Sequence, residues 1–257
     1  MSNYIQMRNQ EVEFIHFDTS IIDNGEFFYT FSKSERESQW ITRIAMARIL
    51  MADLLPKNID RVLYLDGDIL VTGDIRELYY TDLGKNLAGM VLQFGFEQDY
   101  YNSGVILADL KKWRDENISE QMLEFLENNK TRFIYEKPNS NSFLYPDQDL
   151  INNVLATRIK QLPNKWNNQV LGGYMMESIN LSIIIHYLGA KKPWDYTDEK
   201  HPAYVLYRSY WNKSGLIKYK FYYAIKRIKK EYLKIINYKI DRFYRTFSLD
   251  KSLHKGR

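Results

Sequence analysis

Two aspartates stand two residues apart directly after a short apolar run, since residues 63–68 read Leu-Tyr-Leu-Asp-Gly-Asp. The run at residues 62–65 is bounded by polar residues and predicts a buried central strand. Ligands of open α/β sheets bind where strands end, so Asp66 and Asp68 are well placed for chemistry, and Gly67 keeps the space between them clear. Carboxylate oxygens suit Mg²⁺ or Mn²⁺, and such an ion usually also holds substrate phosphates. The alternative is a surface turn, because Asp and Gly are common turn residues.

The same dyad also fits a phosphatase of the haloacid-dehalogenase type. In that class the first aspartate is the nucleophile and the second is the general acid. Such enzymes normally carry the dyad near the start of the chain and need a later lysine and a second acidic cluster. Here the dyad lies further into the chain and no matching second cluster follows it. The phosphatase is therefore the lesser alternative.

Two other segments place polar residues beside expected strands and helices. Residues 101–104, Tyr-Asn-Ser-Gly, form a polar turn before an apolar run at residues 105–108. Residues 146–152, Pro-Asp-Gln-Asp-Leu-Ile-Asn, begin an amphipathic segment for which Asp147 is the expected N-cap.

A β-branched run at residues 181–187 carries His186 near its end, and Lys192 follows six residues later. Taken alone, His186 is more typical of a hydrogen-bonded structural histidine than of a metal ligand. Trp194, taken alone, is more typical of packing than of stacking on a substrate.

The elements that must position these residues follow from hydrophobic periodicity. Strands alternate with helices, which predicts an α/β sandwich with a largely parallel sheet. Strands are expected at residues 11–17, 62–65, 87–92, 105–108 and 181–187. Helices are expected at residues 39–55, 110–113, 119–128 and 147–156, and a polar loop at residues 136–143.

Taken together, the four ordered segments resemble glycosyltransferase family 8 over about residues 12 to 195. That family contains bacterial lipopolysaccharide galactosyl- and glucosyltransferases and general stress protein A. The resemblance implies a fold of GT-A type, in which helices flank a Rossmann-like mixed sheet. It also implies a hexosyltransferase that retains anomeric configuration, with UDP-glucose or UDP-galactose as donor. The acceptor would be a cell-envelope glycan, lipid or protein.

The resemblance also implies roles for individual residues near the donor diphosphate. Asp66, Asp68 and His186 match the family's ligands for Mn²⁺, with Mg²⁺ as the alternative ion. The metal would neutralise the diphosphate and stabilise UDP as it leaves. Lys192 matches a lysine that contacts the diphosphate, and Gly189 lies in the same turn.

Further matches concern the donor sugar. Arg48 matches an arginine that reaches the donor, to which Asp66 and Gly67 also lie close. Asn102, Asp147 and Gln148 match residues that line the sugar pocket, with Gln148 near the reacting face. The expected catalytic residues are Gln148 and Asp147. A front-face reaction is favoured over double displacement because a glutamine is a poor nucleophile.

The chain departs from the family pattern at two places. Residues 12–17 match the second strand of the fold, and no earlier strand is expected. Gln93 stands where many relatives carry an aspartate, and the segment at residues 94–99 is short. These departures leave open a second hypothesis, a non-catalytic remnant that binds a membrane or a partner transferase.

Charge divides the chain into a catalytic domain, expected at residues 1–212, and a tail at residues 213–257. The tail holds 14 Lys and Arg against 3 acidic residues, whereas the remainder holds 22 against 29. From residue 221 onward, apolar residues recur every three or four positions, which predicts a basic amphipathic helix for anionic membrane surfaces. A helix packed on the domain is the alternative, and nucleic acid is not expected as a partner.

Cellular location follows from three absences in the sequence. It contains no cysteine, no apolar signal segment at its start and no run of apolar residues long enough to span a bilayer. A cytoplasmic protein is therefore expected, with peripheral contact on the inner face of the membrane.

Overall fold

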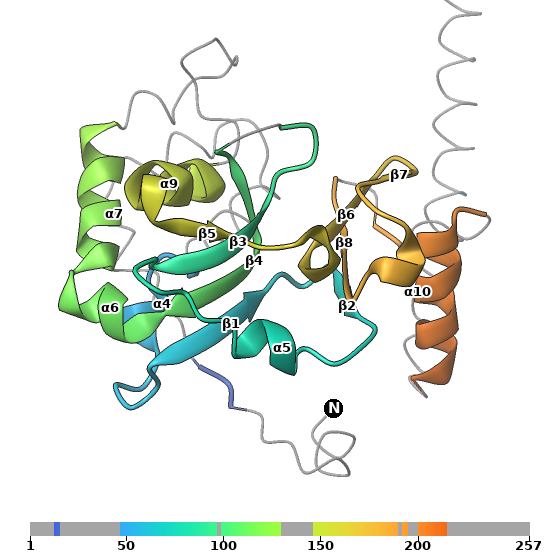
Figure 1. Ribbon diagram of the computed structural model, residues 1–257, viewed down its shortest axis with the longest axis horizontal. Helices are drawn as coiled ribbons and strands as arrows, with labels where there is room; N and C mark the ends of the chain where they lie inside the picture. The colour runs from blue at the N-terminus through green and yellow to red at the C-terminus, as the bar shows by residue number, and fades with distance from the viewer. Residues whose placement is uncertain are drawn as a thin grey trace, which may run out of the picture. The chain divides into compact units, whose positions relative to one another are not determined.

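The computed structural model describes residues 13–15, 47–96, 99–129, 146–189, 192–194 and 200–214. The chain divides into two compact units, Met1–Tyr196 and Thr197–Arg257. Within the first unit, two four-stranded sheets and several helices are described (Figure 1). In the second unit, the described helix is α10 (Pro202–Lys213), which begins with a proline and is capped by His201. The domain boundary expected at residues 212 and 213 stays a prediction.

The first sheet has the strand order β1-β4-β3-β5. Its strands are β1 (Arg61–Leu65), β3 (Ala88–Leu92), β4 (Tyr101–Asp109) and β5 (Ile159–Gln161). β4 pairs antiparallel with β1 and β3, and β3 pairs parallel with β5. The first eight residues of β4 are buried, as expected of a strand whose both faces are covered.

The second sheet has the strand order β2-β8-β6-β7. Its strands are β2 (Ile69–Val71), β6 (Asn168–Leu171), β7 (Tyr174–Met175) and β8 (Ile184–Tyr187). β8 pairs antiparallel with β2 and parallel with β6. The chain passes from β1 to β2 through residues 66–68, so the aspartate dyad lies in one of the connections between the two sheets.

Two apolar clusters cover opposite faces of the first sheet. One cluster packs β3 and β4 against four helices: α4 (Met51–Leu54), α6 (Leu110–Asp115), α7 (Ile118–Asn128) and α9 (Pro146–Leu155). These helices lie on one side of the sheet in Figure 1. The other cluster joins α5 (Arg76–Tyr79) and the 3₁₀ helix η3 (Asn164–Trp166) to β8. The other 3₁₀ helices among the described residues are η2 (Ala156–Arg158) and η4 (Ile179–Leu181).

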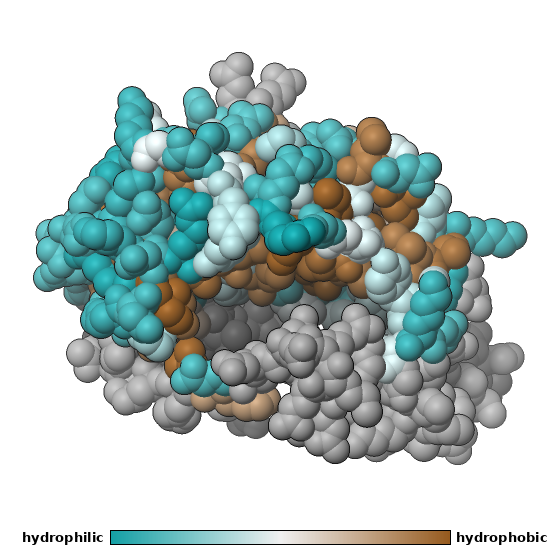
Figure 2. Space-filling view, turned by 60° about the horizontal axis from the view of Figure 1, so that its bottom comes forward, coloured by the Kyte–Doolittle hydropathy of each residue, from teal (hydrophilic) through white to brown (hydrophobic). Residues whose placement is uncertain are grey.

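Individual side chains define how these helices start and pack. The Asp109 carboxylate accepts a hydrogen bond from the Lys112 amide (3.0 Å) and so caps α6. Trp113 is fully buried and donates its indole N–H to the Leu87 carbonyl (3.0 Å). Helix α7 buries Ile118, which lies on the same helical face as two later apolar residues, Met122 and Leu126. Figure 2 shows a largely hydrophilic surface on the side where α6 and α7 lie, and hydrophobic residues toward the middle of that face.

Several expected elements are confirmed. β1 and β4 contain their predicted apolar runs, and β3 contains residues 88–92 of the run predicted at residues 87–92. The helices α6, α7 and α9 match the predicted helices to within two residues at each end. The C-terminal part of the run at residues 181–187 forms β8, while its start belongs to η4. Of the helix expected at residues 39–55, the described portion is helical only in its last turn, α4.

Three expectations are wrong. The sheet is mixed rather than largely parallel, because within each sheet two of the three described pairings are antiparallel. β1 is half-buried and pairs only with β4 among the described strands, so it is an edge strand in this part of the chain. Asp147 lies inside the first turn of α9, which begins at Pro146, and is therefore not its N-cap.

Other expectations concern residues that the structure does not describe. Of the strand expected at residues 11–17, only residues 13–15 are described, and they are exposed and without regular structure. The loop at residues 136–143 and the basic tail beyond residue 214 lie outside the described residues. Within the described residues, no helix combines the length and the apolar character that crossing a membrane requires.

Candidate functional site

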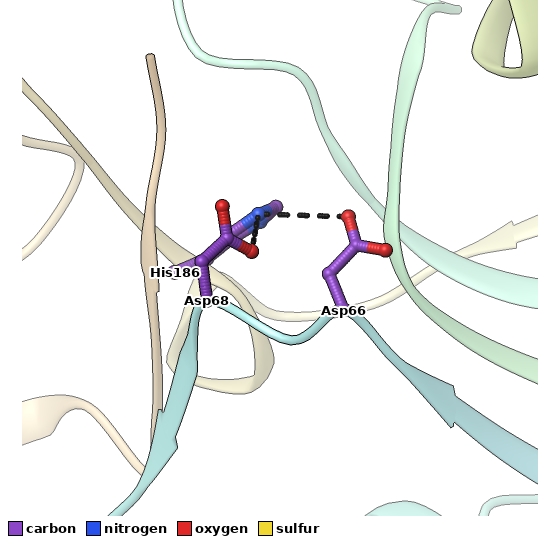
Figure 3. Close-up of side chains that lie close together, drawn as sticks. All are labelled: Asp66, Asp68 and His186. Atoms are coloured by element: carbon purple, nitrogen blue, oxygen red, sulfur yellow. Dashed lines mark ion pairs between the residues drawn. The ribbon is translucent and has the colours of Figure 1, made fainter. Parts of the chain in front are cut away.

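Asp66, Asp68 and His186 bring two carboxylates and one imidazole to a single point (Figure 3). One ligand atom from each lies within 4.8 Å of the other two. His186 Nε2 is 3.3 Å from Asp68 Oδ1 and 3.8 Å from Asp66 Oδ2. Two oxygens and one nitrogen facing one another fit a divalent cation such as Mn²⁺.

The backbone of both sheets fixes this cluster. The Asp66 amide donates to the Gly104 carbonyl of β4 (2.9 Å), which extends the first sheet by one residue. The Tyr187 amide donates to the Asp68 carbonyl (3.1 Å), and Ile69 pairs with His186 across the second sheet. The dyad is therefore tied to β4 at one end and to β8 at the other.

Lys192 contacts the outer side of the dyad. Its ammonium group forms an ion pair with Asp68 Oδ2 and donates to the Tyr187 carbonyl (2.9 Å). Burial by itself raises the pKa of the Asp68 carboxyl, but hydrogen bonds and charge from His186 and Lys192 outweigh burial and hold that pKa well below its usual range. Asp68 is therefore an ionised group, as a cation ligand must be.

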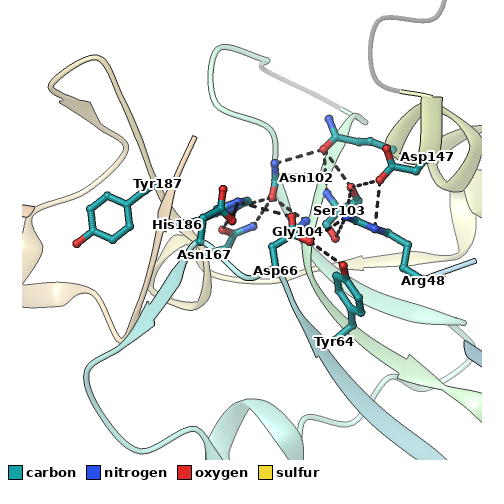
Figure 4. Close-up of polar contacts among 12 residues, drawn as sticks. Arg48, Tyr64, Asp66, Asn102, Ser103, Gly104, Asp147, Asn167, His186 and Tyr187 are labelled. Atoms are coloured by element: carbon teal, nitrogen blue, oxygen red, sulfur yellow. Dashed lines mark hydrogen bonds and ion pairs between the residues drawn. The ribbon is translucent and has the colours of Figure 1, made fainter. Parts of the chain in front are cut away.

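Arg48 binds the inner side of the dyad (Figure 4). Its guanidinium donates to Asp66 Oδ1 (2.8 Å) and to the carbonyl and hydroxyl oxygens of Ser103 (2.8 Å each). Its Nε lies 3.2 Å from Asp147 Oδ2. Burial lowers the pKa of Arg48, but the charges of Asp147 and Asp66 outweigh burial and raise it overall.

Tyr64 completes this side of the site. Its ring lies 4.7 Å below the Arg48 guanidinium, and its hydroxyl donates to Asp66 Oδ1 (2.7 Å). Burial raises the pKa of the Tyr64 hydroxyl, so the group remains a neutral donor. Tyr64, which the sequence placed only in a strand, thereby orients one carboxylate of the dyad.

Asn102 and Gln148 lie in a buried amide network beside the cluster. Asn102 donates to Gln93 Oε1 (2.9 Å) and to Gln148 Oε1 (3.3 Å), while Gln148 donates to Gln93 Oε1 (3.0 Å). The Ser103 amide also donates to Gln148 Oε1 (2.9 Å). Gln93, noted as a departure from the family pattern, is thus a hydrogen-bonding partner of two expected site residues.

Glycines leave space at three points of the site. A Cβ added at Gly104 would lie 2.1 Å from His186 Cε1, so a larger residue would displace the imidazole. A Cβ at Gly67 would meet no atom within 4 Å, which leaves open space beside the dyad. Gly189 has a φ of +83°, in the region that favours glycine, and its Cβ would lie 3.2 Å from Leu171 Cδ1.

The structure brings together most residues singled out from the sequence. Arg48, Asp66, Asp68, Asn102, Asp147, Gln148, His186 and Lys192 are joined by direct contacts. Gly67 and Gly189 lie in the adjoining turns, and the donor contacts expected of them stay predictions. Trp194 is 38% exposed, and the packing role expected of it stays a prediction.

Sequence reasoning did not single out four residues that contact the cluster: Tyr64, Ser103, Gly104 and Asn167. Ser103 and Gly104 belong to the polar run at residues 101–104, so their position gave a signal. The turn expected there is wrong, because these residues are paired as the start of β4. Asn167 belongs to the run Asn-Lys-Trp-Asn-Asn-Gln at residues 164–169, in which amide side chains are unusually dense.

Comparison with known proteins identifies the family of this chain. The family model of Glycosyl transferase family 8 matches residues 2–198. General stress protein A of Bacillus subtilis (strain 168) is 29% identical, over 79% of this chain and 75% of that protein. Lipopolysaccharide 1,2-glucosyltransferase of Escherichia coli (strain K12) is 30% identical, over 60% of this chain and 49% of that protein. The chain thus spans about half the length of several relatives.

Solved structures share the fold. The galactosyltransferase LgtC, in complex with donor and acceptor sugar analogs, aligns with a TM-score of 0.56 and 24% identity, over 77% of this chain and 73% of that one. The glycosyltransferase GlyE of Streptococcus pneumoniae TIGR4 aligns with a TM-score of 0.50 and 26% identity, over 63% of this chain and 42% of that one.

The fold is that of a GT-A type glycosyltransferase. The chain belongs to glycosyltransferase family 8. The resemblance inferred from the sequence and the mixed α/β fold are thereby confirmed. The family match gives the haloacid-dehalogenase alternative no support.

Proposed function

We propose that the protein transfers a hexose from UDP-glucose or UDP-galactose to a cell-envelope glycan, lipid or protein, with retention of anomeric configuration. The observation that carries this proposal is the convergence of Asp66, Asp68 and His186 between two cationic side chains, Arg48 and Lys192. A nucleotide diphosphate is the donor group for which a divalent cation and a nearby lysine are suited.

Asp66, Asp68 and His186 would hold Mn²⁺ or Mg²⁺. When bound, the ion supplies a Lewis acid that stabilises negative charge on the diphosphate. Lys192 would exchange part of its contact with Asp68 for a phosphate oxygen. The open space beside Gly67 leaves room for that approach.

Arg48, Asn102 and Asp147 would bind the donor sugar, and Arg48 already holds Asp147 in place (3.2 Å). Gln148 would lie near the anomeric carbon. Its amide oxygen accepts hydrogen bonds from Ser103 and Asn102. Because these bonds occupy that oxygen, they favour a positioning role for Gln148 over a nucleophilic one. In the proposed front-face reaction, the bond from the anomeric carbon to UDP breaks as the acceptor oxygen bonds on the same face. The departing phosphate takes the acceptor's proton.

The basic tail would bring the enzyme to an anionic membrane surface on the cytoplasmic side. Its charge of 14 Lys and Arg against 3 acidic residues supports this part of the proposal. A lipid-linked acceptor would then be close to the site.

The test is hydrolysis and transfer of UDP-glucose and UDP-galactose with and without Mn²⁺, in the wild type and in Asp68→Asn. Loss of a metal ligand removes several kcal/mol of transition-state stabilisation, so kcat/KM should fall by at least about 100-fold. Asp74→Asn is the matched control, because Asp74 is exposed and pairs with Arg76 on the surface.

Two outcomes contradict the proposal. Turnover that is independent of metal, or unchanged in Asp68→Asn, rules out the metal site. Absence of UDP binding in calorimetry, with Mn²⁺ present, identifies the chain as the non-catalytic remnant instead.

A further inference from the structure

Asn167 is a fully buried residue between η3 and β6 whose side chain contacts the candidate metal histidine. Its Oδ1 lies 3.1 Å from His186 Nδ1, and its Nδ2 donates to Asn102 Oδ1 (2.8 Å). Asn102 Oδ1 lies 3.1 Å from the same His186 nitrogen. Two amide side chains therefore face the ring nitrogen that points away from the aspartates (Figure 4).

The backbone determines which end of each amide faces the histidine. The Gly104 N–H, which can only donate, lies 3.0 Å from one side-chain atom of Asn102, so that atom must be the oxygen. The Asn167 atom in contact with this oxygen must then be a nitrogen, and the other Asn167 atom must be the oxygen that faces His186. Both groups that face His186 Nδ1 are thus acceptors.

The far side of the network leads to the same orientation. The Ser103 N–H donates to Gln148 Oε1, so the nitrogen of Gln148 faces Gln93 Oε1 (3.0 Å). Asn102 Nδ2 points toward the oxygens of Gln93 and Gln148. None of the amide side chains in this network, Gln93, Asn102, Gln148 and Asn167, can be reversed without placing two donors or two acceptors against each other.

Acceptors face Nε2 as well, because the Asp66 and Asp68 carboxylates lie 3.8 and 3.3 Å from it. A cation held between Nε2 and the aspartates would take the Nε2 lone pair, and the two acceptors at Nδ1 then hold the ring proton on Nδ1. This tautomer is the one that binds a cation through Nε2, and the ring proton of a metal-bound histidine is commonly held by such a partner.

We infer that Asn167 is a positioning residue which, together with Asn102, holds His186 in the Nδ1–H tautomer and presents Nε2 to the cation site. The inference rests on the proposed function only for the identity of the group at Nε2. The orientation of His186 belongs to the protein itself.

The first measurement needs no variant. The protein contains four histidines, His16, His186, His201 and His254, so ¹⁵N labelling of histidine gives a small set of ring signals. With diamagnetic Mg²⁺ added, its spectrum should show a protonated Nδ1 and an unprotonated Nε2. An unprotonated Nδ1 as the main form would overturn the inference.

The second measurement uses Asn167→Leu, which removes the oxygen at Nδ1 with little change in volume. His186 should then show a mixture of tautomers, and the affinity for Mn²⁺ alone should fall by about 10–100-fold in calorimetry. Asn168→Leu is the matched control. Asn168 is also fully buried, but its side chain bonds the backbone of Glu177 and the Ser182 hydroxyl instead of His186.

The outcomes separate the inference from the proposed function. Unchanged tautomer and Mn²⁺ affinity in Asn167→Leu, or an equal loss in Asn168→Leu, would overturn the inference. A wild type with the Nδ1–H tautomer that binds no Mn²⁺ would overturn the metal site and leave the role of Asn167 in orienting His186 supported.

Discussion

Gly104 and His186 show how little room the site has at the scale of single residues. The imidazole occupies the position that a side chain on residue 104 would need, and the Gly104 amide fixes the orientation of Asn102. One glycine therefore provides both the space for a candidate metal ligand and the donor that orients the amides behind it.

Gly104→Ala should impair the site more than the fold. The added Cβ must push His186 aside, and overpacking of this kind costs about 1–3 kcal/mol of stability. Mn²⁺ affinity should fall by at least about 10-fold because Nε2 no longer faces the two aspartates. Calorimetric titration and urea unfolding measure the two effects.

Gly67→Ala is the control for this change, since a methyl group there meets no protein atom. Its stability should stay within about 1 kcal/mol of the wild type. Equal Mn²⁺ affinity in Gly104→Ala and the wild type would show that His186 is not the ligand.

Residue types revealed part of this site in advance, and spatial contacts revealed the rest. Asp66, Asp68 and His186 have side chains whose chemistry is visible in the sequence, and ordered motifs related them to one another. Asn167 and Gly104 have no such chemistry. Their roles depend on contact with His186, which the pairing of β2 with β8 and the path of η3 bring about.

At the scale of elements, Arg48 joins parts of the chain that are distant in sequence. It lies just before α4 and binds Ser103 in β4, Asp66 after β1 and Asp147 in α9. A planar guanidinium can serve these acceptors in several directions at once, whereas an ammonium group cannot.

Arg48→Lys should therefore lower stability by about 1–3 kcal/mol, because buried acceptors lose their donors. The measurement is urea unfolding at neutral pH. Arg158→Lys is the matched control: Arg158 pairs with Glu116 at a half-exposed position, so the same substitution should cost less than about 1 kcal/mol. Equal costs for the two substitutions would contradict the joining role of Arg48.

Strand positions were predictable for a local reason, whereas strand directions were not. The apolar runs of β3 and β4 are properties of single segments, and these segments form strands as expected. Direction depends on which partner a strand finds. β4 lies between β1 and β3 and runs opposite to both, which no local pattern encodes.

For the whole molecule, the dominant feature of the sequence is the separation of charge between the body and the tail. The region from residue 213 to the end carries an excess of 11 positive charges, and the remainder an excess of 7 negative charges. Basic residues near an anionic bilayer contribute about 1 kcal/mol each, so even a few of them give measurable binding.

The full chain should bind vesicles that contain phosphatidylserine, and a chain ending at Ser214 should bind them at least 10-fold more weakly, on the order expected from losing a few such residues. Vesicle co-sedimentation measures both. Binding should decrease as salt is added, because salt screens the attraction. Vesicles of phosphatidylcholine alone are the control, and equal binding by the shortened chain would assign membrane contact to another surface.

The connection between β1 and β2 has a consequence for resistance to unfolding. Two of the converging side chains, Asp66 and Asp68, belong to the shortest described connection between the sheets, residues 66–68, while His186 belongs to the second sheet. Any ligand held by Asp66, Asp68 and His186 therefore joins this connection to the second sheet. A ligand that binds only the native state raises the stability of the protein with the logarithm of the ligand concentration. The melting temperature therefore reports how fully the site is occupied. The two sheets should therefore stay folded to a higher temperature when the ligand is bound.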